Sequence, residues 1–290
     1  MKWRHGADLP PLPWLEVVNP LVLLGRVRHA LFDFDGTISV IRRGWDKIMA
    51  SMMVEMICGE YPPTPEIESE VAEYVDQSTG ILTIQQMRWL EDAVRRHGLS
   101  QSRRSARDYK QVYNERLLGP VRERLGQMNP GLSGRNKLAV VGARAFLLGL
   151  RERGVTLYLA SGTDQVYVVE EASALGVDRL FDGRIFGARD DTEEWTKERI
   201  IQDILQTNKL KGEELLVVGD GPVEIQSGKA LGAVTLGIAA DEKRRQGLDP
   251  RKRQRLLAAG ADLIVTDFSQ HKDLLRLLLP GEEAASASMA

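Results

Sequence analysis

Carboxylates follow two apolar runs of the sequence, and their spacing suits the binding of a metal ion. Asp33 and Asp35 come after the run 27–32 and lie two residues apart, so in extended backbone both side chains face the same side. Asp220 comes after another run, 215–218. Carboxylates held close together repel one another unless a cation or a shared proton intervenes. An all-oxygen set favours a hard cation, and Mg²⁺ is the ion that we expect.

Hydrogen-bond donors suited to a phosphoryl group follow two further elements. Ser161 follows the apolar run 155–160, and Lys197 opens a helical pattern after a glycine- and acid-rich loop. A hydroxyl, an ammonium group and backbone amides are the donors that phosphoryl oxygens require, and Gly36 permits a tight turn that brings backbone close to phosphate. An aspartate nucleophile beside a second aspartate, acting as acid and base, could hydrolyse a phosphate ester in two steps.

These residues depend on elements that bring the strand ends together. Short apolar runs indicate buried strands at 27–32, 155–160, 215–218, 233–238 and 262–265. Helical periodicities separate them at 141–153, 166–175, 196–206, 223–231 and 250–258. This alternation predicts a parallel sheet, and the unbroken apolar character of the strands indicates helices on both faces. In such sheets ligands bind at the carboxyl ends of the strands, where the polar residues lie.

Residues 40–137 interrupt the alternation and are predicted to form a helical domain. Their helical patterns cover 45–57, 66–75, 83–97 and 105–125. The core would then comprise residues 27–39 and 138–280. Residues 1–26 are predicted to form an arm packed on the core, where it would cover a sheet edge. The small and polar residues 281–290 are predicted to be a disordered tail.

Four motifs, in this order along the chain, resemble those of the haloacid dehalogenase superfamily of phosphatases. They are Asp33-Phe34-Asp35-Gly36-Thr37, Ser161-Gly162, Lys197 at a helix start, and Gly219-Asp220 with Glu224 nearby. The resemblance implies an α/β fold with a Rossmann-like, doubly wound parallel sheet. The insert between the first two motifs resembles the helical cap of phosphoglycolate-phosphatase-like members.

The resemblance also implies roles for the motif residues. Asp33 would attack phosphorus, and Asp35 would protonate the leaving oxygen and later activate water. Ser161 and Lys197 would hold the transferring phosphoryl group. The residues expected to bind substrate are Gly36, Thr37, Gly162, Arg43 and Gln85. The expected Mg²⁺ ligands are Asp33, the backbone carbonyl of Asp35, Asp220, and Glu224, which could instead hold a metal-bound water.

For two of these residues, Arg43 and Gln85, the assignment to substrate binding is based only on their place in the sequence. Arg43 follows the first motif, at the hinge of the insert, and Gln85 lies near a helix start within it. Either side chain could reach into the cleft and contact the leaving group of the substrate. Packing inside the insert is an equally good interpretation for both.

The expected function is hydrolysis of a small phosphorylated metabolite, such as a sugar phosphate or a phosphoglycolate-like acid. A large insert would roof the site and so disfavours macromolecular substrates. A sugar phosphomutase, which uses the same aspartyl-phosphate, is one alternative, and a non-catalytic binding module on a retained fold is another. A dehalogenase is disfavoured, since halide displacement does not need the second acid Asp35.

The composition of the chain disfavours two classes of partner, nucleic acids and membranes. The net charge of −2 gives no global basic field for nucleic acid. The basic runs 103–107, 243–245 and 251–253 are interleaved with or flanked by acids, and we interpret them as solvated helix faces. No apolar run reaches the roughly 18 residues of a membrane span, and the first residues lack a signal-peptide pattern. We therefore expect a cytoplasmic enzyme without nucleic-acid or membrane partners; the sequence does not indicate its oligomeric state.

Overall fold

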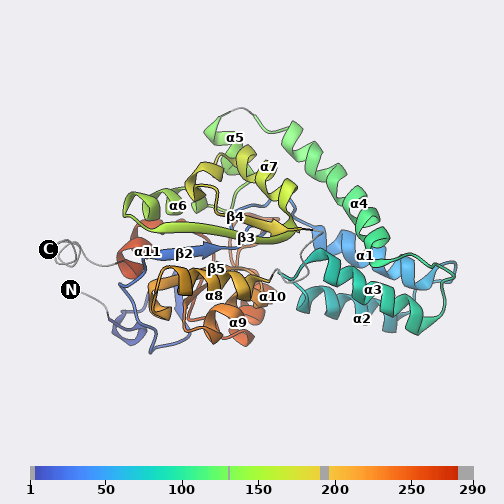
Figure 1. Ribbon diagram of the computed structural model, residues 1–290, viewed down its shortest axis with the longest axis horizontal. Helices are drawn as coiled ribbons and strands as arrows, with labels where there is room; N and C mark the ends of the chain where they lie inside the picture. The colour runs from blue at the N-terminus through green and yellow to red at the C-terminus, as the bar shows by residue number, and fades with distance from the viewer. Residues whose placement is uncertain (1–3, 130, 190–195, 280–290) are drawn as a thin grey trace.

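A computed structural model describes residues 4–129, 131–189 and 196–279, and a seven-stranded sheet forms its centre (Figure 1). The strand order is β1-β7-β6-β5-β2-β3-β4. The strands are β1 (Leu15–Val17), β2 (His29–Phe32), β3 (Thr156–Asp164), β4 (Ile185–Ala188), β5 (Leu215–Gly219), β6 (Val234–Ile238) and β7 (Leu263–Val265). Neighbouring strands run parallel, except that β1 is antiparallel to β7. The predicted α/β fold with a doubly wound parallel sheet is confirmed.

Alternate residues of the strands pack against opposite faces of the sheet. Phe32 and Val218 belong to the core cluster on one face, whereas Leu31 and Val217 pack with Ile201 on the other. Because both faces are covered, the central strands read as unbroken apolar runs, and all five predicted strands are present. Sequence reasoning missed β1 and β4, which have only three and four residues.

Helices cover both faces of the sheet (Figure 1). One face carries α6 (Ala143–Glu152), α7 (Gln165–Leu175) and α11 (His271–Leu278). The other face carries α8 (Lys197–Thr207), α9 (Pro222–Ala230) and α10 (Pro250–Ala258). Short 3-10 helices lie at Gly6–Asp8, Asp178–Phe181 and Gly212–Glu214. The start of α10 is fixed by the side chain of Asp249, which accepts hydrogen bonds from the backbone N–H groups of Arg251 and Lys252.

The insert is all-helical and lies beyond the carboxyl ends of the strands (Figure 1). Its helices are α1 (Trp45–Cys58), α2 (Pro65–Gln77), α3 (Thr83–His97) and α4 (Ala106–Gly126). They pack on one another, with Met52, Met53 and Tyr109 fully buried. A further helix, α5 (Leu132–Lys137), packs against α7 of the core. All four predicted helices of the insert are present.

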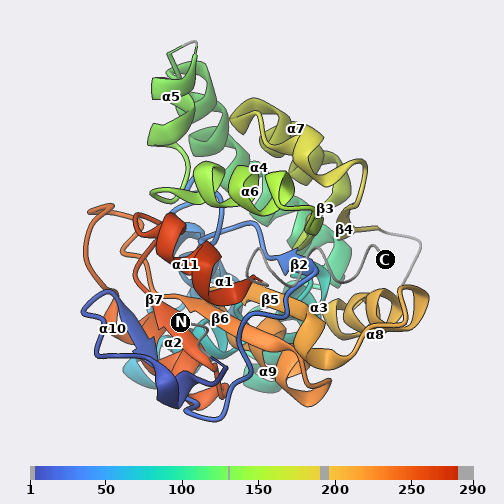
Figure 2. The same cartoon turned by 90° about the vertical axis from the view of Figure 1, so that its left-hand side faces the viewer.

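The N-terminal arm lies along the edge of the sheet at β7 (Figure 2). The backbone N–H groups of Val18 and Asn19 donate to the carbonyl oxygen of Asp262, and Asn19 Nδ2 donates to Asp262 Oδ1 at 2.6 Å. The arm therefore covers the β7 edge of the sheet. The predicted tail 281–290 lies outside the described residues. Among the residues that are described, no helix is both long and apolar enough to cross a membrane.

Candidate active site

Three strand ends meet at the edge of the sheet that faces the insert. Strand β2 pairs with β3 on one side and with β5 on the other, all three running parallel. Asp33 follows β2, Ser161 lies in the last part of β3 and Asp220 follows β5. All three side chains are buried. The sheet thus brings together carboxylates and a hydroxyl that are far apart along the chain.

Lys197 connects two buried carboxylates. Its Nζ lies 2.6 Å from Oδ1 of Asp33 and 2.8 Å from Oε2 of Glu224. The lysine is the first residue of α8, where the hydroxyl of Thr196 accepts the backbone N–H of Arg199 and fixes the helix start. Burial raises the pKa of Asp33 well above its ordinary value, although Lys197 opposes the shift. Burial alone lowers the pKa of Lys197, but the two carboxylates outweigh it, so the lysine stays charged.

Asp35 faces the hydroxyl groups at the end of β3. Thr163 Oγ1 donates to Oδ2 of Asp35 at 3.0 Å, and Ser161 Oγ donates to the same oxygen at 3.4 Å. Oδ1 of Asp35 has no hydrogen-bond partner among the described residues, and Nε of Arg42 lies 3.9 Å from it. Burial raises the pKa of Asp35, with Arg42 opposing. A carboxyl group in this setting can retain a proton and then release it, as a general acid must.

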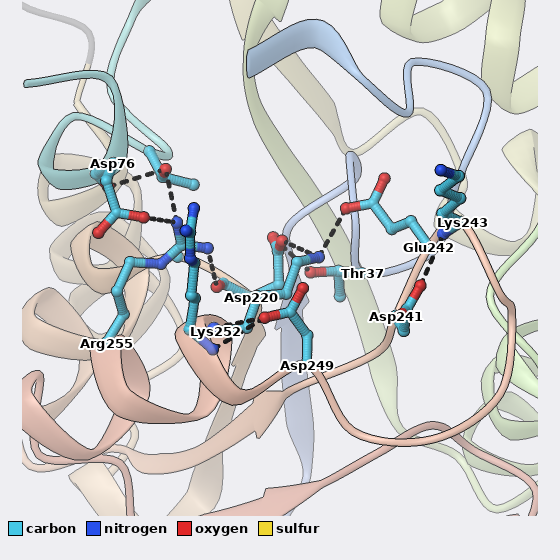
Figure 3. A network of polar contacts seen from close by, with 12 residues as sticks. Thr37, Asp76, Asp220, Asp241, Glu242, Lys243, Asp249, Lys252 and Arg255 are labelled. Carbon is cyan, nitrogen blue, oxygen red and sulfur yellow. Dashed lines mark hydrogen bonds and ion pairs between the residues drawn. The ribbon is translucent and has the colours of Figure 1, made fainter. Parts of the chain in front are cut away.

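The carboxylate of Asp220 contacts both Thr37 and Lys252 (Figure 3). Thr37 Oγ1 donates to Oδ1 of Asp220 at 3.4 Å, and Lys252 Nζ lies 2.7 Å from Oδ2. Gly36 approaches the same carboxylate with a φ of +80°, and a Cβ on that residue would collide with it. Glycine is therefore required at position 36 for both its backbone conformation and the space it leaves.

Three of the carboxylates could hold a metal ion. Asp33, Asp220 and Glu224 each offer an oxygen within 4.8 Å of the others. These three carboxylates outnumber the two lysines that contact them, so a cation would offset the excess of negative charge when all three are ionised. The donors are all oxygen, as a hard cation prefers. These residues therefore fit a bound metal ion.

Glu224 has both carboxylate oxygens engaged within the protein. Oε1 accepts the backbone N–H of Gly221 at 2.8 Å, and Oε2 accepts from Lys197. The first contact closes the start of α9, and the second holds the lysine toward Asp33. This geometry favours a role in orienting Lys197; direct ligation of a metal by Glu224 stays a prediction.

The pattern of motifs and the geometry of the site agree with a family-level comparison. Residues 27–232 match the haloacid dehalogenase-like hydrolases. The chain belongs to this family. No curated protein matches the chain.

Solved structures with this fold include other haloacid dehalogenase-like proteins. A predicted phosphoglycolate phosphatase from Haemophilus somnus 129PT has 16% identity and a TM-score of 0.58, over 86% of this chain and 98% of that one. A predicted phosphatase from Clostridium acetobutylicum has 18% identity and a TM-score of 0.55, over 87% and 99%. A putative beta-phosphoglucomutase from Bacteroides vulgatus has 16% identity and a TM-score of 0.57, over 87% and 89%. At these identities the likeness shows the fold.

In this haloacid dehalogenase-like hydrolase the insert roofs a small cavity above the carboxylates. The cavity has a volume of about 60 Å³, and both core and insert line it, the latter with Thr79, Gly80 and Tyr113. Gly162 approaches the insert so closely that a Cβ there would collide with the carbonyl oxygen of Ile81. The second motif, Ser161-Gly162, therefore needs a glycine at position 162, where the insert meets the core.

Arg42 and Gln86 line this cavity, whereas Arg43 and Gln85 are not among its described lining residues. Arg42 is buried, and its Nη2 lies 2.6 Å from Oε1 of Glu171. Gln86 is also buried and donates to the carbonyl oxygen of Ser78. The hinge and the insert thus contribute polar side chains to the cavity, and substrate contacts by Arg43 and Gln85 stay predictions.

Lys252 is a charged residue of the site that sequence reasoning missed. Its run, 251–253, was expected to be a solvated helix face, yet Lys252 is only 8% exposed. It lies four residues before Leu256, which is fully buried, so both face inward from α10. That spacing was the available signal. The pairing of Lys252 with Asp220 depends on tertiary structure and has no local signature.

Proposed function

We propose that this chain is a Mg²⁺-dependent phosphatase that hydrolyses a small phosphomonoester through an aspartyl-phosphate on Asp33. The observation that carries the proposal is the placement of Asp33 and Asp35 on one small cavity, with Lys197 against the first and hydroxyl groups against the second. A nucleophile, an acid and donors for phosphoryl oxygens are the parts that this chemistry requires. Membership of a hydrolase family supports it.

In the first step, a carboxylate oxygen of Asp33 forms a bond to phosphorus while the bond from phosphorus to the substrate's alcohol oxygen breaks. Asp35 gives its proton to that oxygen, and the alcohol leaves. The raised pKa of Asp35 suits this role, because the group must be protonated before the step. Lys197 and Ser161 hold the phosphoryl oxygens, and Lys197 also keeps Asp33 in place.

In the second step, water attacks phosphorus, and the bond between phosphorus and Asp33 breaks. Asp35, now ionised, accepts a proton from the water, and inorganic phosphate is released. The hydroxyl groups of Thr163 and Ser161 hold Asp35 toward the reacting atoms in both steps. One carboxyl group can therefore serve as acid and then as base.

Asp33, Asp220 and the backbone of Asp35 would hold Mg²⁺. The ion would supply positive charge that lowers the repulsion between Asp33 and the anionic phosphoryl group. A cation there would also counter the effect of burial on the pKa of Asp33 and keep the nucleophile ionised.

The roof supports a small substrate. The cavity leaves only about 60 Å³ for the centres of water-sized molecules, and the insert forms part of its wall. A site that an insert encloses in this way favours a free metabolite over a macromolecule. We assign residues 40–137 to this cap and residues 27–39 and 138–280 to the core. A sugar phosphate or a phosphoglycolate-like acid fits such a site.

Release of inorganic phosphate from a panel of phosphomonoesters, with Mg²⁺ and with EDTA, tests the proposal. The wild type should hydrolyse at least one ester with Mg²⁺, and Asp33→Asn should abolish that activity while the protein remains folded. Trapping of ³²P on the wild-type protein, with loss of the label in Asp33→Asn, identifies the intermediate. Equal rates for the two proteins on every ester contradict the assignment.

A sugar phosphomutase is the second candidate, supported by the shared fold with a putative beta-phosphoglucomutase. The first step would be the same, but a sugar hydroxyl would take the place of water in the second. Incubation with sugar phosphates and separation of isomerised product from free phosphate distinguishes the two. Excess isomerised product would assign the mutase.

A further inference from the structure

Lys252 places a buried positive charge beside a predicted metal ligand. Its Nζ lies 2.7 Å from Oδ2 of Asp220 and 2.6 Å from Oε1 of Glu242 (Figure 3). The side chains of all three are at most 17% exposed. The ammonium group therefore acts through a medium of low dielectric, where its charge is weakly screened.

The position of Lys252 is fixed from two directions. The backbone N–H of Lys252 donates to the side chain of Asp249 at the start of α10, which sets the direction in which the residue points. The Nζ also lies close to Gly36, where a Cβ would be 2.9 Å away. The ammonium group of Lys252 therefore packs against the turn of the first motif. Burial alone lowers its pKa, but Asp220 and Glu242 outweigh that effect, so it remains charged.

We propose that Lys252 is a resident cation of the metal site, which shares Asp220 with the divalent ion and thereby limits the affinity of the site for that ion. The inference rests on the proposed function for the presence of a divalent-ion site at Asp33 and Asp220. It assigns Lys252 a positioning role, because the lysine acts on the metal through Asp220.

Two consequences follow from this arrangement. Without a divalent ion, Lys252 offsets the charge of Asp220 and holds that carboxylate in place. Repulsion between the carboxylates of Asp33 and Asp220 therefore does not push them apart. With a divalent ion, the positive charge of Lys252 repels the ion that Asp220 binds. The lysine therefore stabilises the metal-free protein and weakens metal binding.

Isothermal titration with MgCl₂ on the metal-free protein tests this inference, with thermal unfolding as a second readout. Lys252→Met should bind Mg²⁺ more tightly than the wild type by about tenfold or more, since the variant lacks a buried positive charge that repels the ion. Metal-free Lys252→Met should melt at a lower temperature than the wild type, and Mg²⁺ should raise its Tm by more.

The matched control is Arg251→Met, because Arg251 is the preceding residue on α10, carries the same charge and is exposed. It should leave the Mg²⁺ affinity within twofold of the wild type. Lys252→Arg keeps the charge and should leave the affinity close to the wild-type value. Unchanged or weaker Mg²⁺ binding by a folded Lys252→Met protein overturns the inference.

A second variant decides the matter if Lys252→Met does not fold. Glu242→Gln removes one of the two carboxylates that share the lysine and should weaken Mg²⁺ binding. Asp241→Asn makes the same charge change one residue earlier, where the side chain contacts Arg244 and not Lys252. Glu242→Gln must weaken binding several-fold more than Asp241→Asn, and equal effects overturn the inference.

The titration does not depend on turnover, so the two proposals can fail separately. If Lys252→Met binds Mg²⁺ more tightly but no phosphomonoester is hydrolysed, the inference stands and the phosphatase proposal fails. If phosphatase activity requires Mg²⁺ but the variant's affinity is unchanged, only the inference fails. If neither protein binds Mg²⁺, the inference is overturned.

Discussion

Nζ of Lys197 lies 2.6 Å from Oδ1 of Asp33, with their side chains 2% and 7% exposed. The cost of removing two charges from water offsets much of the attraction in such a buried pair, so its contribution to stability is small. Its contribution to orientation is larger, because Lys197 also contacts Glu224 and cannot turn away without losing two partners. The lysine thus fixes the direction of the proposed nucleophile.

Replacement of Lys197 by methionine should reduce kcat/KM by about a hundredfold to a thousandfold, as for removal of a donor to transition-state oxygens. The variant leaves Asp33 and Glu224 without their shared cation, so its stability should fall by up to about 3–5 kcal/mol. Lys209→Met is the control, since Lys209 is an exposed lysine just after the same helix. Phosphate release and urea unfolding of both proteins give the comparison. A Lys197→Met protein as active as Lys209→Met contradicts the assigned role.

Gly36 and Gly44 offer a matched test of the space around Asp220. Both have a positive φ, of +80° and +83°, but a Cβ at Gly44 meets nothing within 4 Å. Alanine should therefore cost roughly 1–2 kcal/mol of backbone strain at either position. Gly36→Ala must also displace Asp220, so it should be less stable than Gly44→Ala and lose most Mg²⁺ binding and activity. Equal Mg²⁺ affinities for the two variants would show that Asp220 is not a ligand.

Much of this site could be predicted from sequence because each motif follows a buried strand or opens a helix. Asp33 and Asp220 follow strands that are buried on both faces, and such strands are recognisable in the sequence as unbroken apolar runs. Parallel pairing of these strands brings their ends together. The helices of the insert were visible through their periodicity. The strands β1 and β4 were not, since Glu16 divides the first and Gly187 interrupts the second.

The remaining residues of the site depend on tertiary contacts. Lys252 contacts Asp220, which lies 32 positions earlier in the chain, and Arg42 contacts Glu171 of α7. Which of Arg42 and Arg43 lines the cavity could not be predicted, because the direction of a side chain in a turn depends on packing that the sequence does not display. Charged residues that pair inside a protein look like surface residues until their partners are known.

The pair of Arg42 and Glu171 leads to a prediction about pH. Burial raises the pKa of Glu171 to about 7, although Arg42 opposes it. Because the folded protein holds this proton more tightly than the unfolded chain, stability is greatest below about pH 4.5 for this group and is lost as the pH rises through about 7. The side chain of the Glu171→Gln variant does not titrate. Between pH 4.5 and 7.5 the free energy of unfolding of the wild type should therefore fall by up to about 3 kcal/mol relative to that of the variant.

Urea unfolding at several pH values measures this difference. Glu170→Gln is the control, because Glu170 is the exposed preceding residue of α7. Its free energy of unfolding should follow the wild-type curve across the range. A constant difference between the wild type and Glu171→Gln at every pH would mean that Glu171 titrates with an ordinary pKa.

Arg255 connects the core to the roof of the cavity. Its Nη1 lies 2.7 Å from Oδ1 of Asp76 at the end of α2 and 3.3 Å from Oγ1 of Thr79 (Figure 3). Its Nη2 is 3.5 Å from the backbone carbonyl oxygen of Asp220. One side chain of α10 therefore spans from the end of β5 to the loop that lines the cavity, so it should stabilise the closed position of the insert.

Arg255→Met should shift the insert toward open positions. Because a half-exposed ion pair is worth about 1 kcal/mol or less, we expect kcat/KM to fall about two- to fivefold and hydrogen exchange in residues 76–81 to accelerate. Arg253→Met is the control, since Arg253 lies on the same helix and pairs with Glu16 of the N-terminal arm at 2.6 Å. It should leave exchange in that loop unchanged. If both variants accelerate exchange in residues 76–81 equally, the effect comes from α10 as a whole, and Arg255 does not hold the insert closed.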